Sequence, residues 1–250
     1  MQRGSAPESV RIGLIIPSSN TMVEPDFMRN LPDGATLHSA RMYLAETTAA
    51  AERAMIFDYA PRAVSDLASL HPHVVAFACT SGGAILGEDG ERELMGRIAS
   101  ETGAHVVSTN DAVKAHLTRY NPRRVAVITP YIDELNDRIR AGLEARGLNI
   151  VRIRGMGITE NYAIATVSPS EIVAFAEEQL AGADFDLLFA SCTNWNGVRA
   201  RPLLIERFGV PVVTSNQATI VATLEAGGLR PPAGSELEDR SDRVSEPVRL

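Results

Sequence analysis

The stretch HVVAFACTSGG, residues 73–83, decides the fold. A short run of apolar residues ends in Cys79, and Thr80 and a Ser-Gly-Gly turn follow it. Continuous apolar runs of this length are typical of parallel strands that are buried on both faces. The chain has two cysteines, and the second, Cys192, occupies the same place in DLLFASCTNWN, residues 186–196. Both thiols therefore lie at the end of a predicted buried strand.

The pattern around each cysteine belongs to a longer repeat. The interval from Pro17 to Cys79 equals the interval from Pro130 to Cys192. A single shift in residue number, called the repeat offset below, therefore relates each residue of the first pair to its counterpart in the second. The strands predicted in the first copy are RIGLIIP (11–17), HVVAFAC (73–79) and AHVVSTN (104–110); those in the second are RRVAVITP (123–130), FDLLFASCT (185–193) and the start of VPVVTSNQATIVATL (210–224).

The repeat predicts an α/β protein made of two duplicated Rossmann-like halves, each a small parallel sheet with helices on both faces. Residues 59–70 and 80–98 have the spacing of helices. We expect the first half to span 10–117 plus about 217–230, and the second half to span 118–216. Residues 231–250 are Pro-rich and charged, which predicts a polar tail that is disordered or loosely docked.

Ligands of parallel α/β sheets bind beyond the carboxyl ends of the strands. A pseudo-twofold axis would bring Cys79 and Cys192 face to face across a cleft between the halves, where they could flank one small substrate. The alternative is that both are buried core thiols, since free cysteine is among the most buried residue types. The repeated Cys-Thr at a strand end favours the site.

Neutral hydrogen-bonding groups follow the other strand ends. They include Ser19 and Asn20 in PSSN, Tyr131 in TPYID, and the threonines after the two cysteines, Thr80 and Thr193. Each Ser, Thr or Asn taken alone could be a helix N-cap. Together they suit a small carboxylate held by donors and dipoles.

Composition excludes several classes of function. The chain has 250 residues, of which 45% are hydrophobic, and a formal net charge of −7, with no basic stripe for nucleic acid. No apolar run is long enough to span a membrane, and the N-terminal residues lack the apolar core of a signal peptide. We expect a cytoplasmic homo-oligomer with reduced thiols. The five histidines lack metal-ligand spacing and no phosphate loop is present, so we expect no metal or cofactor.

Six segments carry a resemblance to a known family: PSSN (17–20), ACTSG (78–82), ITPYIDELNDRIRAGLEARGL (128–148), GITENYAIATVSPSEI (157–172), SCTN (191–194) and PVVTSNQA (211–218). Over about residues 10–230 the chain resembles the aspartate/glutamate racemase superfamily, in its branch of maleate cis–trans isomerases and arylmalonate decarboxylases. SCTN and TSNQ also resemble ectoine-utilisation relatives of maleate isomerase.

The resemblance implies substrate-binding or catalytic roles for Asn20, Cys79, Tyr131, Asn161 and Cys192. In the decarboxylases a glycine typically replaces the first cysteine, so two cysteines favour an isomerase or a racemase. The segment TNWNG after Cys192 departs from the usual isomerases, which implies a reshaped pocket.

The leading hypothesis is a cofactor-independent isomerase of a small unsaturated dicarboxylate such as maleate. By this resemblance, the Cys79 thiolate would add to the double bond, its pKa lowered by the helix N-terminus, and Cys192 would move a proton. One alternative is a two-cysteine racemase of an amino acid or a related 2-substituted acid. Others are an ectoine-degradation enzyme and a two-lobed binding protein for a small carboxylate.

Overall fold

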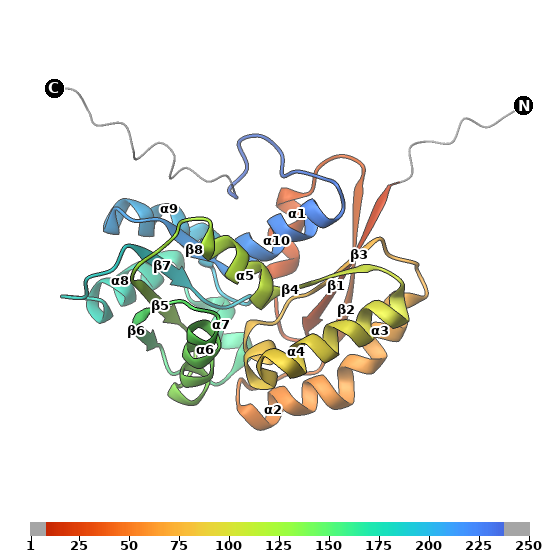
Figure 1. Ribbon diagram of the computed structural model, residues 1–250, viewed down its shortest axis with the longest axis horizontal. Coiled ribbons are helices and arrows are strands. Elements are labelled where there is room, and N and C mark those ends of the chain that lie inside the picture. Colours follow the sequence, from red (N-terminus) through yellow and green to blue (C-terminus); the bar gives the residue numbers. More distant parts are fainter. Residues whose placement is uncertain (1–8, 238–250) are drawn as a thin grey trace, which may run out of the picture.

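The chain forms two four-stranded sheets that lie side by side, each covered by helices (Figure 1). The structure is a computed structural model and describes residues 9–237. In the first sheet, β1 (Val10–Pro17), β2 (Ala35–Met42), β3 (Val74–Phe77) and β4 (His105–Ser108) take the order β2-β1-β3-β4. In the second, β5 (Val125–Thr129), β6 (Ile150–Gly155), β7 (Leu187–Ala190) and β8 (Val212–Thr214) take the order β6-β5-β7-β8.

All paired strands in both sheets are parallel, and the two strand orders are equivalent. The prediction of two duplicated parallel-sheet halves is confirmed. The repeat offset that relates the two cysteines also relates β3 to β7 from end to end, since it leads from Val74 to Leu187 and from Phe77 to Ala190.

Helices connect the strands. Those of the first half are α1 (Val23–Asn30), α2 (Ala49–Ala54), the π-helical turn η1 (Met55–Tyr59), α3 (Ala60–Ala68), α4 (Thr80–Thr102) and α5 (Thr109–Thr118). Those after β5 are α6 (Asp133–Ala145), α7 (Asn161–Thr166), α8 (Pro169–Gln179), α9 (Gly197–Phe208) and α10 (Ser215–Ala226). The predicted helices over 59–70 and 80–98 correspond to α3 and α4. None of the described helices combines the length and apolarity that a bilayer crossing requires.

Two differences from the predicted strands concern the site. Strand β3 ends at Phe77 and β7 ends at Ala190, so each cysteine lies in the loop or helix cap beyond its strand rather than inside it. The edge strands β2 and β6 had no predicted counterpart. Most of their side chains are only partly buried or exposed, so they lack the continuous apolar run of a central strand.

Helix α10 follows the second sheet in the chain but packs on the first. Its residues Ile220 and Leu224 share a buried cluster with Ile12 and Leu14 of β1, and it also contacts α5. Leu237 joins the same cluster, and its carbonyl accepts a hydrogen bond from Gln217 at 3.1 Å. Residues 231–237 are therefore docked rather than loose, because an apolar side chain anchors them; residues 238–250 lie outside the described part of the chain.

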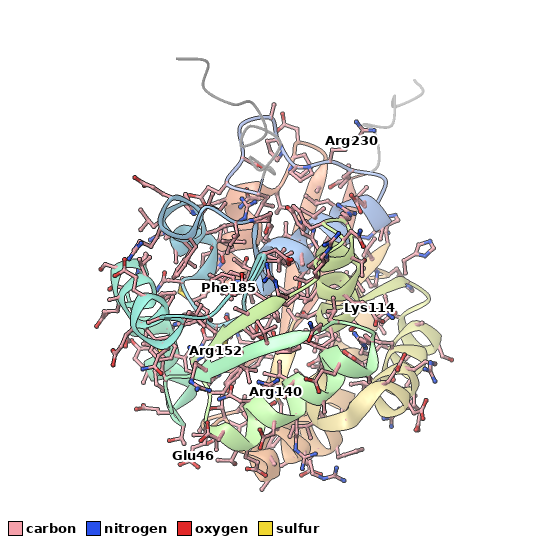
Figure 2. All side chains as sticks on the ribbon, turned by 60° about the vertical axis from the view of Figure 1, so that its left-hand side comes forward. Glu46, Lys114, Arg140, Arg152, Phe185 and Arg230 are labelled. Carbon is pink, nitrogen blue, oxygen red and sulfur yellow. The ribbon has the colours of Figure 1, made fainter. Side chains whose placement is uncertain are left out.

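The two halves also meet through a short antiparallel contact of loops. Thr47 N–H donates to the Thr159 carbonyl at 2.7 Å, and Asn161 N–H donates to the Ala45 carbonyl at 2.8 Å. Between these two hydrogen bonds, Glu46 takes part in an isolated antiparallel β-bridge. Figure 2 shows the Glu46 side chain at the lower edge of the molecule. Asn161, a predicted site residue, is thus held by backbone from the other half.

Gly155, at the end of β6, is required by the close approach of the loop that carries Tyr131. A Cβ at this position would lie 2.1 Å from the Tyr131 carbonyl oxygen and 2.3 Å from Asn136 Nδ2. We expect Gly155→Ala to lower the free energy of unfolding by about 1–3 kcal/mol, the usual cost of overpacking. Gly142→Ala in α6 is the matched control, since its Cβ would meet nothing within 4 Å. Denaturant unfolding of both variants checks this, and equal stability of the two would contradict it.

Candidate active site

Cys79 is the N-cap of α4, directly beyond β3. Its side chain is buried, and its Sγ accepts a hydrogen bond from Gly82 N–H at 3.4 Å. A Cβ on Gly82 would lie 3.1 Å from that sulfur, so glycine lets the first turn of the helix close over the thiol. The predicted position of this thiol at the mouth of a helix is what the structure shows.

Glu52, from α2, lies beside Cys79. Its side chain is fully buried, and its Oε2 is 3.6 Å from the Cys79 Sγ. Ser81 completes the group, because its hydroxyl donates to Glu52 Oε1 and its Oγ lies 3.7 Å from the same sulfur. A thiol, a carboxyl and a hydroxyl thus contact one another inside the protein.

Cys192 lies just beyond β7 and is also buried. Its Sγ accepts a hydrogen bond from Asn194 N–H at 3.2 Å, and the Tyr131 hydroxyl, from the loop after β5, is hydrogen-bonded to the same sulfur. The second thiol therefore has a phenol as its neighbour where the first has a carboxyl.

The two thiols, Tyr131 and Glu52 lie close enough for their charges to act on one another. The charge of Cys192 contributes to raising the pKa of Cys79. The pKa of Tyr131 is raised well above its ordinary value by burial first, and then by the charges of both cysteines and Glu52. The structure therefore brings together Cys79, Cys192 and Tyr131, as the duplicated pattern predicts.

Burial governs the acidity of both thiols. It raises the pKa of Cys79 well above its ordinary value, with the Glu52 charge adding to the effect, and it raises the pKa of Cys192 to about 12. The helix N-terminus favours the Cys79 thiolate only through the weaker Gly82 hydrogen bond. The expectation of a lowered pKa at Cys79 is therefore wrong, because desolvation outweighs the helix.

The predicted threonines hold the two halves together. Thr193 Oγ1 donates to the Ala78 carbonyl at 3.1 Å and accepts from Asn20 Nδ2 at 3.2 Å. Thr80 Oγ1 donates to Ser215 Oγ at 3.0 Å. Since both hydroxyl protons are donated to protein atoms, these side chains position the site rather than offer a free donor. The helix-cap alternative holds for Asn20, whose Oδ1 accepts from two backbone N–H groups at the start of α1.

Asn161 and Ser19 meet at the same junction. Asn161 Nδ2 donates to Ser19 Oγ at 2.8 Å, and Ser19 Oγ donates to the Leu44 carbonyl at 2.5 Å. Asn194 Nδ2 donates to the Asn161 carbonyl at 2.6 Å, while Asn194 Oδ1 accepts from Thr21 N–H at 2.9 Å. One chain of neutral hydrogen bonds therefore runs from the first half to the second beside Cys192.

Sequence reasoning missed Glu52, Ser81 and Asn194. A signal existed for the last two, because the repeat offset leads from Ser81 to Asn194 and each directly follows a Cys-Thr pair. Glu52 gave no such signal, since it lies on a short alanine-rich helix and not at a strand end.

The departure from the family pattern after Cys192 has a structural role. Trp195 is fully buried in the core of the second half, in the cluster that contains Tyr131 and Cys192. Asn196 Nδ2 donates to the Ala165 and Val167 carbonyls at 3.1 and 2.7 Å. This segment therefore fixes the end of α7, the helix that begins with Asn161.

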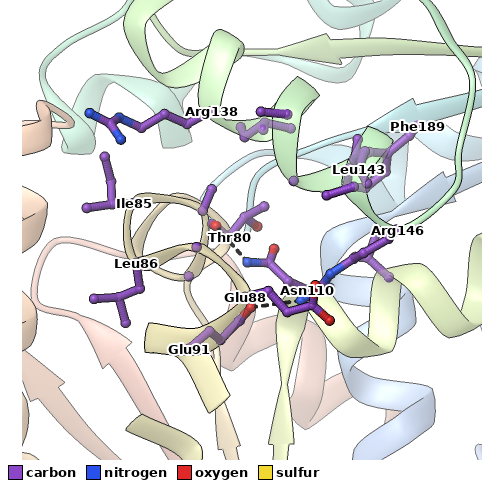
Figure 3. A pocket seen from close by; sticks show the side chains of 18 residues that line it. Thr80, Ile85, Leu86, Glu88, Glu91, Asn110, Arg138, Leu143, Arg146 and Phe189 are labelled. Atoms are coloured by element: carbon purple, nitrogen blue, oxygen red, sulfur yellow. Dashed lines mark hydrogen bonds and ion pairs between the residues drawn. The ribbon is translucent and has the colours of Figure 1, made fainter. Parts of the chain in front are cut away.

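A cavity of about 380 Å³ lies between α4 and α6, apart from the thiols (Figure 3). Its lining includes Thr80 but neither cysteine. Within it, Arg146 pairs with the buried Glu91 at 3.1 Å, and Glu91 also accepts from Ser108 at 2.6 Å. The charges of Arg146 and Glu91 are thus satisfied by one another. Among residues 9–237 no cluster of three potential metal ligands occurs.

The chain is similar to known proteins over most of its length. A family model described as arylmalonate decarboxylase matches residues 12–236. The chain is 31% identical over 247 residues to a maleate isomerase of Nocardia farcinica (92% of this chain, 96% of the relative), and 30% identical over 240 residues to an arylmalonate decarboxylase of Bordetella bronchiseptica (94% and 97%). A solved cysteine-to-serine mutant of the Nocardia farcinica maleate cis–trans isomerase, with a covalently bound succinylcysteine intermediate, is similar with a TM-score of 0.80 and 27% identity (88% and 93%).

Proposed function

Because the chain belongs to the arylmalonate decarboxylase family, we propose that it is a cofactor-independent cis–trans isomerase of a small unsaturated dicarboxylate, of the maleate type. The observation that carries the proposal is the pair of buried thiols in one site, each with different neighbours. A succinylcysteine on a related isomerase supports covalent chemistry at a cysteine.

Cys79 is the nucleophile in this proposal. Its thiolate adds to one alkene carbon, so a sulfur–carbon bond forms while the π bond breaks. The electron pair moves onto the second carbon and its carboxylate as an enolate-like anion. Cys192 then gives its thiol proton to that carbon, which leaves a succinyl thioether. A thiolate is suited to this step because it is a soft nucleophile.

Rotation about the new single bond changes the geometry of the substrate. The Cys192 thiolate then takes back a proton from carbon, and elimination breaks the sulfur–carbon bond and restores the double bond. The product is the trans diacid, and both cysteines return to their starting states. No electrons are gained or lost overall, so the reaction needs no redox cofactor.

The substrate carboxylates bind to neutral donors. The backbone N–H groups of the first turn of α4 lack intrahelical acceptors and favour an anion. The amide side chains of Asn20 and Asn161 and the Tyr131 hydroxyl supply further donors at the same junction. Such donors stabilise the enolate-like charge without creating a fixed countercharge.

Proton NMR in deuterated water tests this function. The protein is incubated separately with maleate, with D- and L-aspartate and glutamate, and with an arylmalonate, with and without EDTA. We expect maleate to be converted to fumarate equally in both conditions. Deuterium exchange at an α-carbon would instead identify a racemase, loss of a carboxyl group would identify a decarboxylase, and no change in any substrate would support a binding protein.

Tyr131→Phe is expected to slow maleate turnover. The change keeps the buried ring and removes the hydroxyl, which hydrogen-bonds to Cys192 and, as we propose, to a substrate carboxylate. A hydrogen bond to a charged group is worth about 1.5–3 kcal/mol of transition-state stabilisation. Steady-state measurement of kcat/KM checks this prediction. Tyr120→Phe is the control outside the site, and a fully active Tyr131→Phe protein would show that this tyrosine only packs.

A further inference from the structure

Glu52 is a buried carboxyl that touches the proposed nucleophile. Its Oε2 lies 3.6 Å from the Cys79 Sγ, and its Oε1 accepts a hydrogen bond from Ser81, so the side chain is oriented toward the sulfur. We propose that Glu52 is the catalytic base of the site, which accepts the Cys79 thiol proton as the sulfur–carbon bond forms and returns it at elimination. This inference rests on the proposed role of Cys79 as nucleophile.

The surroundings of Glu52 do not explain it as a structural residue. The carboxyl is fully buried, and within residues 9–237 no basic side chain forms an ion pair with it. Burying an ionisable group without a countercharge costs free energy, and an uncharged side chain of similar size would avoid that cost. A perturbed carboxyl beside a nucleophilic thiol is the arrangement expected of a functional group. Burial raises the pKa of Glu52 to about 7, so the carboxylate is available near neutral pH.

The duplicated architecture strengthens the argument. The repeat offset leads from Glu52 to Ala165, in α7, which occupies the place of α2 in the second half. Cys192 therefore has no equivalent carboxyl and is hydrogen-bonded to Tyr131 instead. Within residues 9–237 a carboxyl is hydrogen-bonded to Cys79 and none is hydrogen-bonded to Cys192, and Cys79 is the thiol that must lose its proton to attack carbon.

The step balances without any added group. The Cys79 S–H bond breaks, its proton moves to a Glu52 oxygen, and the sulfur electron pair forms the bond to carbon. The negative charge passes from Glu52 through sulfur to the substrate, so the site gains no net charge. Burial raises the pKa of the Cys79 thiol, and a neighbouring base removes the need to ionise it into solvent.

The charges that act on this pair are few. The titratable groups that interact with Glu52 are Cys79, Cys192 and Tyr131. On α2 itself, the Arg53 guanidinium lies over the Phe57 ring at 5.2 Å. On α4, Glu91 is paired with Arg146. The ionisation of Glu52 therefore governs how the reaction rate of Cys79 depends on pH below neutrality. In this acid limb of the pH–rate profile the rate rises with pH through about 7, because only the carboxylate accepts a proton.

The test measures alkylation of Cys79 by iodoacetamide as a function of pH, by intact mass, in a Cys192→Ser background. With Glu52 present we expect the rate to rise through about pH 7 and then to level off. In the Glu52→Gln protein we expect a loss on the order of 10²-fold at neutral pH. Its rate should continue to rise above pH 8 without a plateau, because the thiol must ionise alone. Glu52→Asp should restore the limb in part. Glu91→Gln, which alters another buried carboxyl of the same half, should leave the limb in place.

A second readout separates a base from a structural carboxyl. The pKa of Glu52 is about 7 in the fold against an ordinary value of 4.5, so ionising it destabilises the fold progressively from pH 4.5 to about 7 and fully above that. Glu52→Gln should therefore have a melting temperature at pH 8 that equals or exceeds that of the unsubstituted protein. A marked loss of stability would favour a structural role and overturn the inference.

The two proposals fail in distinguishable ways. If maleate is not isomerised but the alkylation limb moves in Glu52→Gln, the base assignment stands and the proposed substrate is wrong. If maleate is isomerised and the acid limb of Cys79 alkylation is the same in the Glu52→Gln and Glu91→Gln proteins, the base assignment is wrong while the proposed function stands.

Discussion

Cys79→Ser is expected to abolish maleate turnover, with a loss on the order of 10⁴-fold or more, as for the removal of other covalent nucleophiles. A serine hydroxyl is far less acidic than a thiol, and a carboxylate such as Glu52 is too weak a base to ionise it before it attacks carbon. The site is buried, which disfavours an alkoxide further. Serine fits the same space and can keep the Gly82 hydrogen bond, so the fold should be retained.

The measurement is the maleate-to-fumarate rate by proton NMR, together with the melting temperature of the variant. Ser81→Ala is a useful companion, because it removes the hydroxyl that orients Glu52 but leaves the thiol. It should retain measurable turnover. A Cys79→Ser protein with turnover within about tenfold of the starting protein would remove Cys79 from the role of nucleophile.

Cys192→Ser is expected to slow the overall reaction by about 10²–10⁴, the usual contribution of general acid–base catalysis. Addition at Cys79 remains possible in this variant, whereas the group that removes the proton from carbon before elimination is lost. A covalent adduct should therefore accumulate. The observable is the intact mass of the protein after incubation with maleate, followed by peptide mapping of the modified residue.

Each outcome for the Cys192→Ser protein has a distinct meaning. An adduct that maps to Cys79 supports addition to the double bond. An adduct on Cys192 in the Cys79→Ser protein, with turnover preserved, would reverse the assigned roles. The absence of an adduct in every variant, combined with one-directional α-proton exchange in each single mutant, would indicate a racemase.

The central strands were predictable because burial on both faces leaves a local mark. Strands β3 and β7 are apolar throughout, β1 and β5 are apolar apart from Arg11 and Thr129, and the repetition of these strands at one offset revealed the two halves. Strand β2, with the sequence ATLHSARM, shows no such run because it lies at an edge and only part of its surface is covered. Local pattern therefore identified the central strands and the edge strands β4 and β8, but not the edge strands β2 and β6.

The site was predictable to the same extent. Cys79, Cys192 and Tyr131 follow central strands, so topology alone brings them to the same junction. Glu52 reaches the site from α2, and its relevance depends on a contact between segments 27 residues apart. The acidity of Cys79 was mispredicted because burial results from the packing of distant segments around the thiol, which neighbouring residues in the sequence do not report.

The different partners of the two thiols have a consequence for how such a site can be built. In a homodimer with strict symmetry, any carboxyl placed beside one thiol would also stand beside the other, and both would have the same proton affinity. A single chain that contains both copies escapes this constraint, because Glu52 and Ala165 can differ. Covalent linkage of the copies is therefore what permits a division of labour, with one sulfur specialised to attack carbon and the other to handle a proton.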